Sequence, residues 1–560
     1  MATSAQNKTS KKTASKKSNS NNYVTPKNVT TYSLLVKKAT DKYLKTINPN
    51  DFNPQDVAVG LVNATCIEIN SYNKANDAKW KLPTDLLPYQ IALILTKLHH
   101  AALIVLNSAN IGSDHAILAV YNTSGPNVGL YTMERDEFLK LAYTYKPTLT
   151  SKEFDEVLQA LRSMVPLRQR SNNEDLIPVN NGVFDYRTKQ FLHFSPNLVF
   201  TAKSHVNFDP TAENVVLHNN SDNTDWDVES WMKSLSDDPQ IVKLLWQTLG
   251  AIIRPNVSWD KSVWLYSTKG NNGKGTLCEL MRNLCGPGTY AKLSLRDFSE
   301  DFLLEPLIRV SAIITDENDV GTYIDKAANL KAVETGDVIT INRKYQAPVP
   351  CQFKGFMVQC LNEFPKVKDK SESFYRRQIF VPMNKSFKGI ERKYIKQDYL
   401  HRSDVLEYVL KKLLLETNYY ELDIPDVCKT TMEDYKVYND PIREFSKEVV
   451  PNCVWDLLPF KFLYDLYIAW FKKNIPNGKP VSSRSFVSEL REIYEGSNID
   501  GFTCVGDGQT RTGNKMNQPE PMISEYNLHT WMNPNANSNG DPNVKNTPIT
   551  AERYRGLTRL

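Results

Sequence analysis

The sequence predicts a multidomain α/β protein with a central sheet, a mixed α+β part before it and a largely helical part after it. Three observations favour this class. At 560 residues the chain is long enough for three or four domains of roughly 150 residues each. Hydrophobic residues make up 41% of it and charged residues 23%, which supplies real cores and excludes collagen-like and wholly disordered chains. Between about residues 255 and 385, short apolar strands alternate with helical segments, as in an α/β sheet.

The N-terminal segment has the composition of a disordered arm. Its first 28 residues are mostly Ser, Thr, Asn and Lys, with little to bury. The first 40 residues hold eight lysines and no acid, so the rest of the chain carries 60 basic and 63 acidic residues and is not a basic protein. Such an arm holds nucleic acid electrostatically or serves as a solubilising tail, and its composition suits both equally.

Apolar spacing and turn signals predict the elements that precede the sheet. Residues 32–107 show mostly helical spacing, interrupted near Pro83 and Pro88, and His99 and His100 fall in what reads as a core helix. After them we expect two strands around a Ser-Gly-Pro turn, a helix, a hairpin with an Asn181-Gly182 turn, and an amphipathic helix, at 116–122, 127–133, 151–164, 177–197 and 237–253.

The part after about residue 429 changes character. An aromatic-rich helix is predicted at 459–473 and a second helix at 482–494. A long stretch rich in Asn, Pro and Gly (532–548) then separates them from a final strand. Two helices and a terminal strand across a long loop favour a winged-helix-like module, with a plain helical packing domain as the alternative.

Several site classes are excluded by composition. The eight cysteines are scattered without a CxxC pair, which disfavours zinc sites and disulfides and favours small buried hydrophobes. The most apolar stretch, 91–106, is interrupted by Lys97 and two histidines, so no membrane span is expected. The lysines at the N-terminus precede no apolar signal core, and a cytoplasmic location is therefore expected.

The strongest chemical signal is VWLYSTKGNNGKGTL (263–277), an apolar strand followed by a glycine-bearing turn and the start of a helix. Backbone N–H groups in such a turn face an anion, and Lys274 adds a fixed positive charge. Glycines let the backbone approach phosphates closely. A tight strand-to-helix turn without a ligand is the plainer interpretation. The residues expected to bind a nucleotide are Gly270, Asn271, Asn272, Gly273, Lys274, Gly275 and Thr276.

This segment departs from the usual phosphate-loop pattern G-x-x-x-x-G-K-[ST] at two positions. Thr268 replaces the first glycine, and Gly275 stands where a hydroxyl normally binds magnesium. Thr276, one position later, is the obvious substitute and the expected Mg²⁺ ligand.

Polar residues follow the next apolar strands in an order that suits phosphate chemistry. Asp316 and Glu317 end one strand, and we expect the first to bind Mg²⁺ and the second to polarise the attacking water. Asn362 ends another and is placed to hold that water or the γ-phosphate. Arg376 and Arg377 precede a further strand, where one of them stabilises charge on the transferring phosphoryl group.

The order of these motifs resembles superfamily 3 helicases of the phage/plasmid and poxvirus primase-helicase type. The resemblance spans about residues 105–560, and its specific part lies in the ATPase motifs. It rests on GNNGKGT (270–276), TDE (315–317), LKAVETGDVITINRKYQ (330–346), LNEFPKVKD (361–369) and YRRQIFVP (375–382).

The resemblance implies an AAA+-like P-loop ATPase that assembles as a homo-hexamer and uses ATP and Mg²⁺. ATP would lie between subunits, with Lys274 and Asp316 from one and the arginine from its neighbour. Residues 330–346 would form a hairpin that lines the ring channel and places Arg343 and Lys344 on single-stranded or forked DNA, moving 3′ to 5′. An aromatic beside this basic pair could also stack on a base.

The implied protein is a replicative helicase and replication initiator of a phage, plasmid or mobile element, acting with host replication proteins on an origin. The alternatives are an origin-binding ATPase that does not unwind, a primase-helicase that also makes primers, and a small-molecule phosphotransferase. Primer synthesis lacks support, since the one D-x-D, Asp225-Trp226-Asp227, fits a helix start better than a two-metal site.

The expected domains follow from these segments. They are a basic arm (1–30), a helical module (31–105), an α+β domain (106–235), the ATPase (236–385), a helical lid or linker (386–430) and a winged-helix-like domain (431–560).

Overall fold

The computed structural model describes residues 30–107, 115–300, 302–476, 479–495, 499, 501–504, 506, 508–536 and 541–560. The chain divides into two compact units. The first comprises residues up to 101 together with 134–165, and the second comprises 102–133 and 166–560. The arm expected at 1–30 lies outside the described residues except for Thr30.

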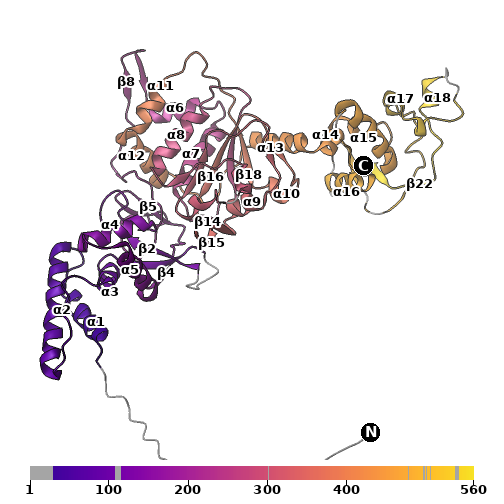
Figure 1. Cartoon of the computed structure of the whole chain (residues 1–560). Coiled ribbons are helices and arrows are strands. Elements are labelled where there is room, and N and C mark those ends of the chain that lie inside the picture. The colour runs from indigo at the N-terminus through magenta and orange to yellow at the C-terminus, as the bar shows by residue number, and fades with distance from the viewer. Residues whose placement is uncertain are drawn as a thin grey trace, which may run out of the picture. The chain divides into compact units, whose positions relative to one another are not determined.

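The first unit is helical, as the apolar spacing predicts (Figure 1). Its helices begin where the sequence supplies a cap: Thr31 and Asn53 cap the first two, and Thr150 forms a capping box with Glu153. The expected core helix around the two histidines is wrong, because the third helix ends at Lys97. The helices are α1 (Tyr32–Leu44), α2 (Pro54–Asn76), α3 (Pro88–Lys97), α4 (Arg135–Tyr145) and α5 (Ser151–Met164).

Two small sheets open the second unit. The first has the order β3-β2-β1-β4, and the second is a meander of β5, β6 and β7. The turn expected at Asn181-Gly182 is one residue out of place, because Val179 pairs with Gly182 and leaves Asn180-Asn181 as the turn. The strand expected at 127–133 is confined to β3. The strands are β1 (Ala102–Val105), β2 (Ile117–Tyr121), β3 (Tyr131–Thr132), β4 (Leu167–Gln169), β5 (Leu176–Val179), β6 (Gly182–Asp185) and β7 (Gln190–Leu192).

A short hairpin and two helices lead to the central sheet. Asp227 caps α6 by accepting a hydrogen bond from the Ser230 N–H at 2.9 Å, which confirms the helix-start role of the D-x-D segment. The elements are β8 (Leu217–Asn219), β9 (Thr224–Trp226), α6 (Val228–Ser234) and α7 (Pro239–Ile253).

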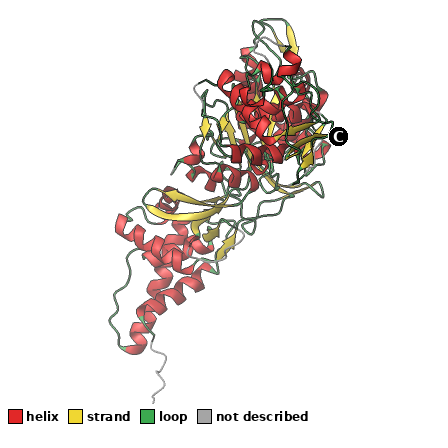
Figure 2. Cartoon of the chain, turned by 90° about the vertical axis from the view of Figure 1, so that its right-hand side faces the viewer, coloured by secondary structure: helices red, strands yellow, loops and turns green. Residues whose placement is uncertain are grey.

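The central sheet is parallel and five-stranded, in the order β11-β12-β16-β10-β18. Side chains of a strand alternate between faces, so Val263 and Leu265 pack with helices α7 and α8, while Trp264 packs in a second core on the other face. Helices accompany the strands throughout this part (Figure 2). The elements are β10 (Ser262–Tyr266), α8 (Lys274–Cys285), β11 (Tyr290–Ala291), β12 (Ala312–Thr315), β16 (Phe356–Leu361) and β18 (Gln378–Pro382).

Several elements are inserted between or after the strands of this sheet. A helix and a long antiparallel hairpin lie between β12 and β16, and a short helix precedes β18. Helix α13 packs against β18 through Tyr435, whose ring lies 4.5 Å from that of Phe380. The elements are α9 (Ala328–Thr335), β14 (Val338–Arg343), β15 (Gln346–Gln352), α10 (Glu372–Tyr375), α11 (Lys393–Gln397), α12 (Ser403–Lys411) and α13 (Asp426–Asn439).

The C-terminal residues form their own aromatic core, centred on Trp455, Phe462, Tyr467 and Trp470. The two predicted helices and the terminal strand are present, and that strand is the middle one of a three-stranded antiparallel sheet, β19-β23-β20. The main elements are α14 (Pro441–Glu448), β19 (Leu457–Pro459), α15 (Phe460–Asn474), α16 (Ser483–Tyr494), β20 (Phe502–Cys504) and β23 (Gly556–Arg559). Among the described residues no helix is both long and apolar enough to cross a membrane.

Candidate functional site

The segment with the strongest chemical signal forms a tight turn between β10 and α8. Helix α8 begins at Lys274, directly after Gly273, which has φ 85°. A Cβ at Gly273 would lie 2.8 Å from Leu235 Cδ2, so both backbone conformation and space require glycine here. At Gly270 a Cβ would meet nothing within 4 Å, so the turn is open on that side. The predicted strand, turn and helix start are therefore present.

Lys274 is a buried cation with neutral partners. Its side chain is inside the fold, with the residue 6% exposed. The Nζ atom donates to the carbonyl oxygens of Ser267 at 3.2 Å and Leu361 at 2.9 Å, and to Oδ1 of Asn362 at 2.8 Å. Burial lowers the pKa of this ammonium group. Since a buried charge is costly without a counter-charge, the arrangement favours an anion as ligand.

The two asparagines of the turn hold its shape. Asn272 is buried and donates to the Lys269 carbonyl at 2.6 Å. Asn271 donates from Nδ2 to Glu391 at 2.8 Å, and its carbonyl accepts from the Phe387 N–H at 2.7 Å. The segment after β18 is therefore fastened to the turn. The side chains of both asparagines are engaged within the protein, which leaves backbone N–H groups and Lys274 to meet a ligand.

Sequence reasoning missed Lys396, a second cation at this turn. It lies on α11, and its Nζ is 3.7 Å from the position that a Cβ on Gly275 would occupy. Gly275 therefore leaves space that the exposed Lys396 side chain approaches at the start of α8. No local signal identifies this lysine, because it is separated from the turn by about 120 residues of chain.

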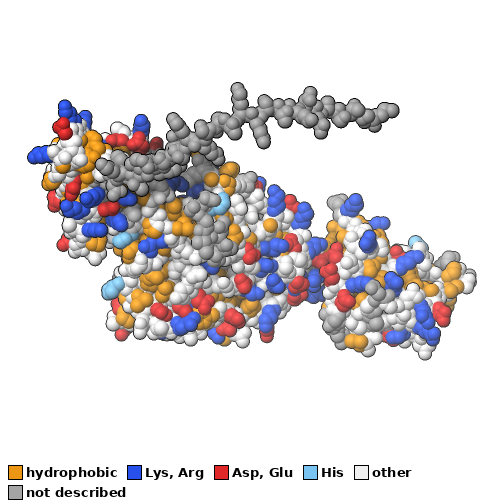
Figure 3. All heavy atoms as spheres, turned by 90° about the horizontal axis from the view of Figure 1, so that it is seen from below, with side chains coloured by type: hydrophobic (Ala, Val, Ile, Leu, Met, Phe, Trp, Pro, Cys, Tyr) orange, Lys and Arg blue, Asp and Glu red, His pale blue; other side chains and the backbone are white. Residues whose placement is uncertain are grey.

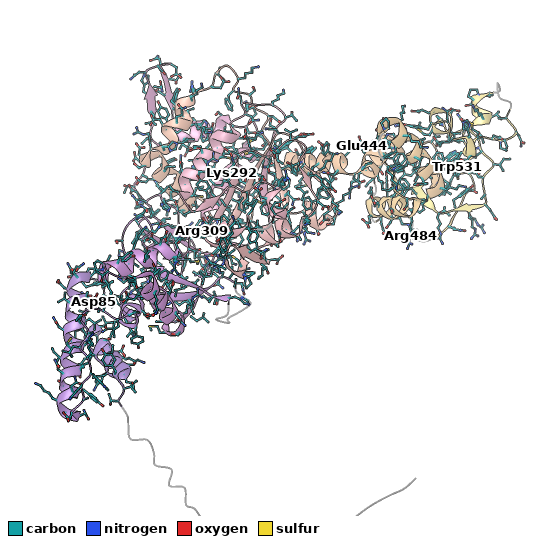
Figure 4. The ribbon with its side chains drawn as sticks, in the orientation of Figure 1. Asp85, Lys292, Arg309, Glu444, Arg484 and Trp531 are labelled. Atoms are coloured by element: carbon teal, nitrogen blue, oxygen red, sulfur yellow. The ribbon has the colours of Figure 1, made fainter. Side chains whose placement is uncertain are left out.

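The two acids after β12 have different surroundings. Asp316 pairs with Arg282 at 3.3 Å and with Lys292 at 3.0 Å; Lys292 is labelled in Figure 4. Burial acts to raise the pKa of Asp316, but the two cations outweigh it and the pKa is lowered. Glu317 is exposed. Because β12 and β16 are parallel neighbours, these acids and Asn362 lie together at the carboxyl ends of the two strands.

The residues at these carboxyl ends suit a nucleotide-borne magnesium ion. Mg²⁺ in such sites keeps waters and phosphate oxygens and takes only one or two protein oxygens. Asp316 offers a carboxylate, although Lys292 and Arg282 now share it, and Thr276 offers a hydroxyl on the first turn of α8. Within the described ranges no group of three or more His, Cys, Asp or Glu side chains gathers as a metal site.

The arginine pair lies at the amino ends of the strands, whereas Lys274 and Asn362 lie at their carboxyl ends. Arg376 and Arg377 come directly before β18, and the Arg377 carbonyl accepts from the Ser262 N–H, at the first residue of β10, at 2.8 Å. The length of β18, five residues or about 17 Å, separates the amino ends of the strands from the carboxyl ends, where Lys274 lies. The structure thus brings together Lys274 and Asn362 but not the arginines. Arg376 is exposed and Arg377 is half-buried.

The remaining predicted residues occupy the tip of the β14–β15 hairpin. Arg343 pairs with Gln346, so Lys344 and Tyr345 form a two-residue turn. Tyr345 is fully exposed and has φ 59°. Arg343 donates to the Ala347 carbonyl at 3.2 Å, which holds its guanidinium along the hairpin. A lysine and an exposed aromatic ring at one tip can contact a phosphate and a base.

Three family models match successive segments of the chain. D5 N terminal like matches residues 66–238, a family of unknown function (DUF5906) matches 265–377, and Poxvirus D5 protein-like matches 438–533. No curated protein matches the sequence.

Solved structures similar to this chain include apo forms of the NrS-1 C-terminal region. One is 11% identical, covers 85% of this chain and 100% of that chain, and has a TM-score of 0.40. A second is 12% identical, covers 84% and 100%, and has a TM-score of 0.42. Likeness at this level carries no weight for function. The D5-like matches on both sides of the Lys274 segment confirm the resemblance that the motifs indicate. Residues 66–238 and 438–533 are therefore similar to D5-type proteins, and the motifs between them resemble those of phage and poxvirus primase-helicases.

Proposed function

We propose that this protein is an ATP-dependent, hexameric replicative DNA helicase, and the replication initiator of a phage, plasmid or mobile genetic element. The observation that carries the proposal is the separation of two cationic groups. Lys274 is buried at the carboxyl ends of the strands, with neutral partners, and the arginine pair lies at the amino ends. One protomer holds half of a phosphate site, and a neighbour supplies the rest.

The chain's residues divide the work as follows. Lys274 and the N–H groups of the turn bind the phosphates, with Asn362 beside them to orient water or the γ-phosphate. Thr276 and Asp316 would hold Mg²⁺, which neutralises charge on the phosphates. Glu317, exposed at the same ends of the strands, orients the attacking water.

The neighbouring protomer completes the site in this proposal. Arg376 is favoured as the residue that crosses the interface, because it is exposed, whereas Arg377 has Nε and Nη1 buried. An arginine that reaches the transferring phosphoryl group raises the rate by roughly 10³ to 10⁵. Residues 236–385 would then be an AAA+-like P-loop ATPase, and the C-terminal three-stranded sheet with α14 to α16 a winged-helix-like domain.

The DNA contact is assigned to the hairpin tip, Arg343 to Tyr345. On the side drawn in Figure 3, basic and acidic side chains are interspersed. Local contacts by a lysine and an exposed ring suit single-stranded DNA in a narrow channel. Movement 3′ to 5′ follows the family resemblance.

The test is strand displacement on a forked DNA, with ATP turnover measured in the same samples. The proposal expects DNA-stimulated ATPase and displaced strand, both lost in Lys274→Ala by about 10²-fold or more. The control is Lys243→Ala, which removes an exposed lysine that pairs with Asp423 on the surface. ATPase without displaced strand would favour an origin-binding initiator. Incorporation of nucleotides on an unprimed template would favour a primase-helicase.

A further inference from the structure

A buried carboxylate joins three parts of the second unit. Glu334, 6% exposed, lies near the end of α9. It accepts hydrogen bonds from Ser262 Oγ at 2.6 Å and from Gln378 Nε2, which lies 3.1 Å from each carboxylate oxygen. Ser262 is the first residue of β10, and Gln378 is the first residue of β18, immediately after the arginine pair. One side chain thus fastens α9 to the amino ends of both strands.

Two cations face this carboxylate without an ion pair. Arg377 and Lys261 both favour the charged form of Glu334, whereas burial raises its pKa to about 7. Nε and Nη1 of Arg377 are buried and have no hydrogen-bond partner among the residues that the structure describes. A guanidinium with two buried, unsatisfied donors that faces a buried acid has a second favourable arrangement available, in which the two groups bond directly.

The hairpin follows Glu334 closely in the chain. Gly336, with φ 66°, ends α9, and β14 begins at Val338. Ile339 and Ile341 of β14 pack in the same core as Leu330 of α9, so helix and hairpin base form one packed body. A path of packed side chains therefore connects the end of α9 to the base of the hairpin.

We propose that Glu334 is a positioning residue that couples the arginine pair to the β14–β15 hairpin, so that nucleotide bound against those arginines changes the affinity of the hairpin for single-stranded DNA. The inference rests on the proposed function, in which the arginines meet the neighbour's nucleotide and the hairpin meets DNA. The coupling is a free energy shared by two ligands and is reciprocal.

The test measures binding of a fluorescent oligo-dT with and without a non-hydrolysable ATP analogue, in the full chain. In the wild-type protein the analogue changes DNA affinity by a factor of about 5 to 150, and DNA changes analogue affinity by the same factor. In Glu334→Gln this factor falls to about 1, while DNA affinity without nucleotide stays within about twofold. Asp337→Asn is the matched control, because it removes an exposed acid from the same helix end and keeps the wild-type factor.

The outcomes separate this inference from the proposed function. A Glu334→Gln protein that keeps the wild-type factor overturns the coupling role, as does a wild-type protein that binds both ligands with a factor of 1. A wild-type protein that binds neither ligand overturns the proposed function itself. Gln378→Met is the second variant, since it removes the amide donor at similar volume, and it also lowers the factor if Glu334 acts through β18.

Discussion

The ammonium group of Lys274 is buried, where water cannot solvate its charge well. The lysine makes three hydrogen bonds to neutral oxygens, and burial lowers its pKa. A site of this kind gains most when an anion arrives, because the ligand supplies the missing counter-charge. The sequence indicated this residue through a local pattern. It could not indicate Lys396, whose approach to Gly275 depends on how the chain returns after β18.

Lys396→Ala is expected to weaken nucleotide binding. The side chain is exposed, so its attraction for a phosphate is screened and worth about 1 kcal/mol, which is roughly a fivefold rise in Kd. Titration with a fluorescent ATP analogue at low and high salt measures the effect, which shrinks as salt rises. Lys393→Ala, on the same helix, is the control. Equal effects of the two variants would show that Lys396 acts only through general charge.

Glu334 makes the stability of the folded protein depend on pH, with a sign opposite to that of an ordinary ion-paired acid. Its folded-state pKa is about 7, above the ordinary 4.5, so the folded state binds the proton more tightly. Stability therefore falls as pH rises from about 4.5 to 7. Lys261, Arg377 and, from α13, Tyr435 are the titratable groups that face it.

Glu334→Gln removes this dependence. The unfolding free energy of the variant, relative to wild type, is expected to rise between pH 5 and pH 8 by up to about 3 kcal/mol. Thermal midpoints at a series of pH values measure it. A constant difference across that range would mean that the carboxyl is ionised throughout.

At the scale of elements, agreement with the sequence is best where local chemistry sets the boundaries. Helix α5 has the predicted bounds, 151–164, because Thr150 and Glu153 cap its start. The parallel strands follow from apolar runs between turns. Local patterns failed where pairing register decides: the turn between β5 and β6 is Asn180-Asn181. Strand order in the sheet, which places β10 between β16 and β18, has no periodic signature at all.

The β14–β15 hairpin carries its own prediction. Lys344→Ala is expected to leave basal ATPase largely intact and to abolish unwinding, because the proposed function assigns Lys344 to the DNA contact and not to the phosphates. The salt dependence of single-stranded DNA binding, log K against log salt, loses about 0.7 of slope for each phosphate contact removed. Lys429→Ala, which removes an exposed lysine of α13, serves as control. Equal loss of ATPase and unwinding would contradict a role confined to DNA.

At the scale of the whole molecule, the two halves of the proposed phosphate site lie at opposite ends of the strands of one sheet. A single copy cannot bring Arg376 or Arg377 to Lys274 across about 17 Å of packed strand. The proposed site therefore requires a second copy, and head-to-tail contacts of this kind generate a ring when the rotation between copies closes. The D5-like matches at 66–238 and 438–533 lie on either side of the segment that carries Lys274 and the arginine pair.

The most direct test of a site shared between subunits is complementation of ATPase activity by mixing. Lys274→Ala and the double variant Arg376→Ala/Arg377→Ala should each be nearly inactive. Mixed in equal amounts and allowed to exchange subunits, they should recover roughly a quarter of wild-type turnover, because that share of interfaces pairs an intact lysine with intact arginines. A mixture that remains as inactive as its parts, although mixed rings form, would contradict the account.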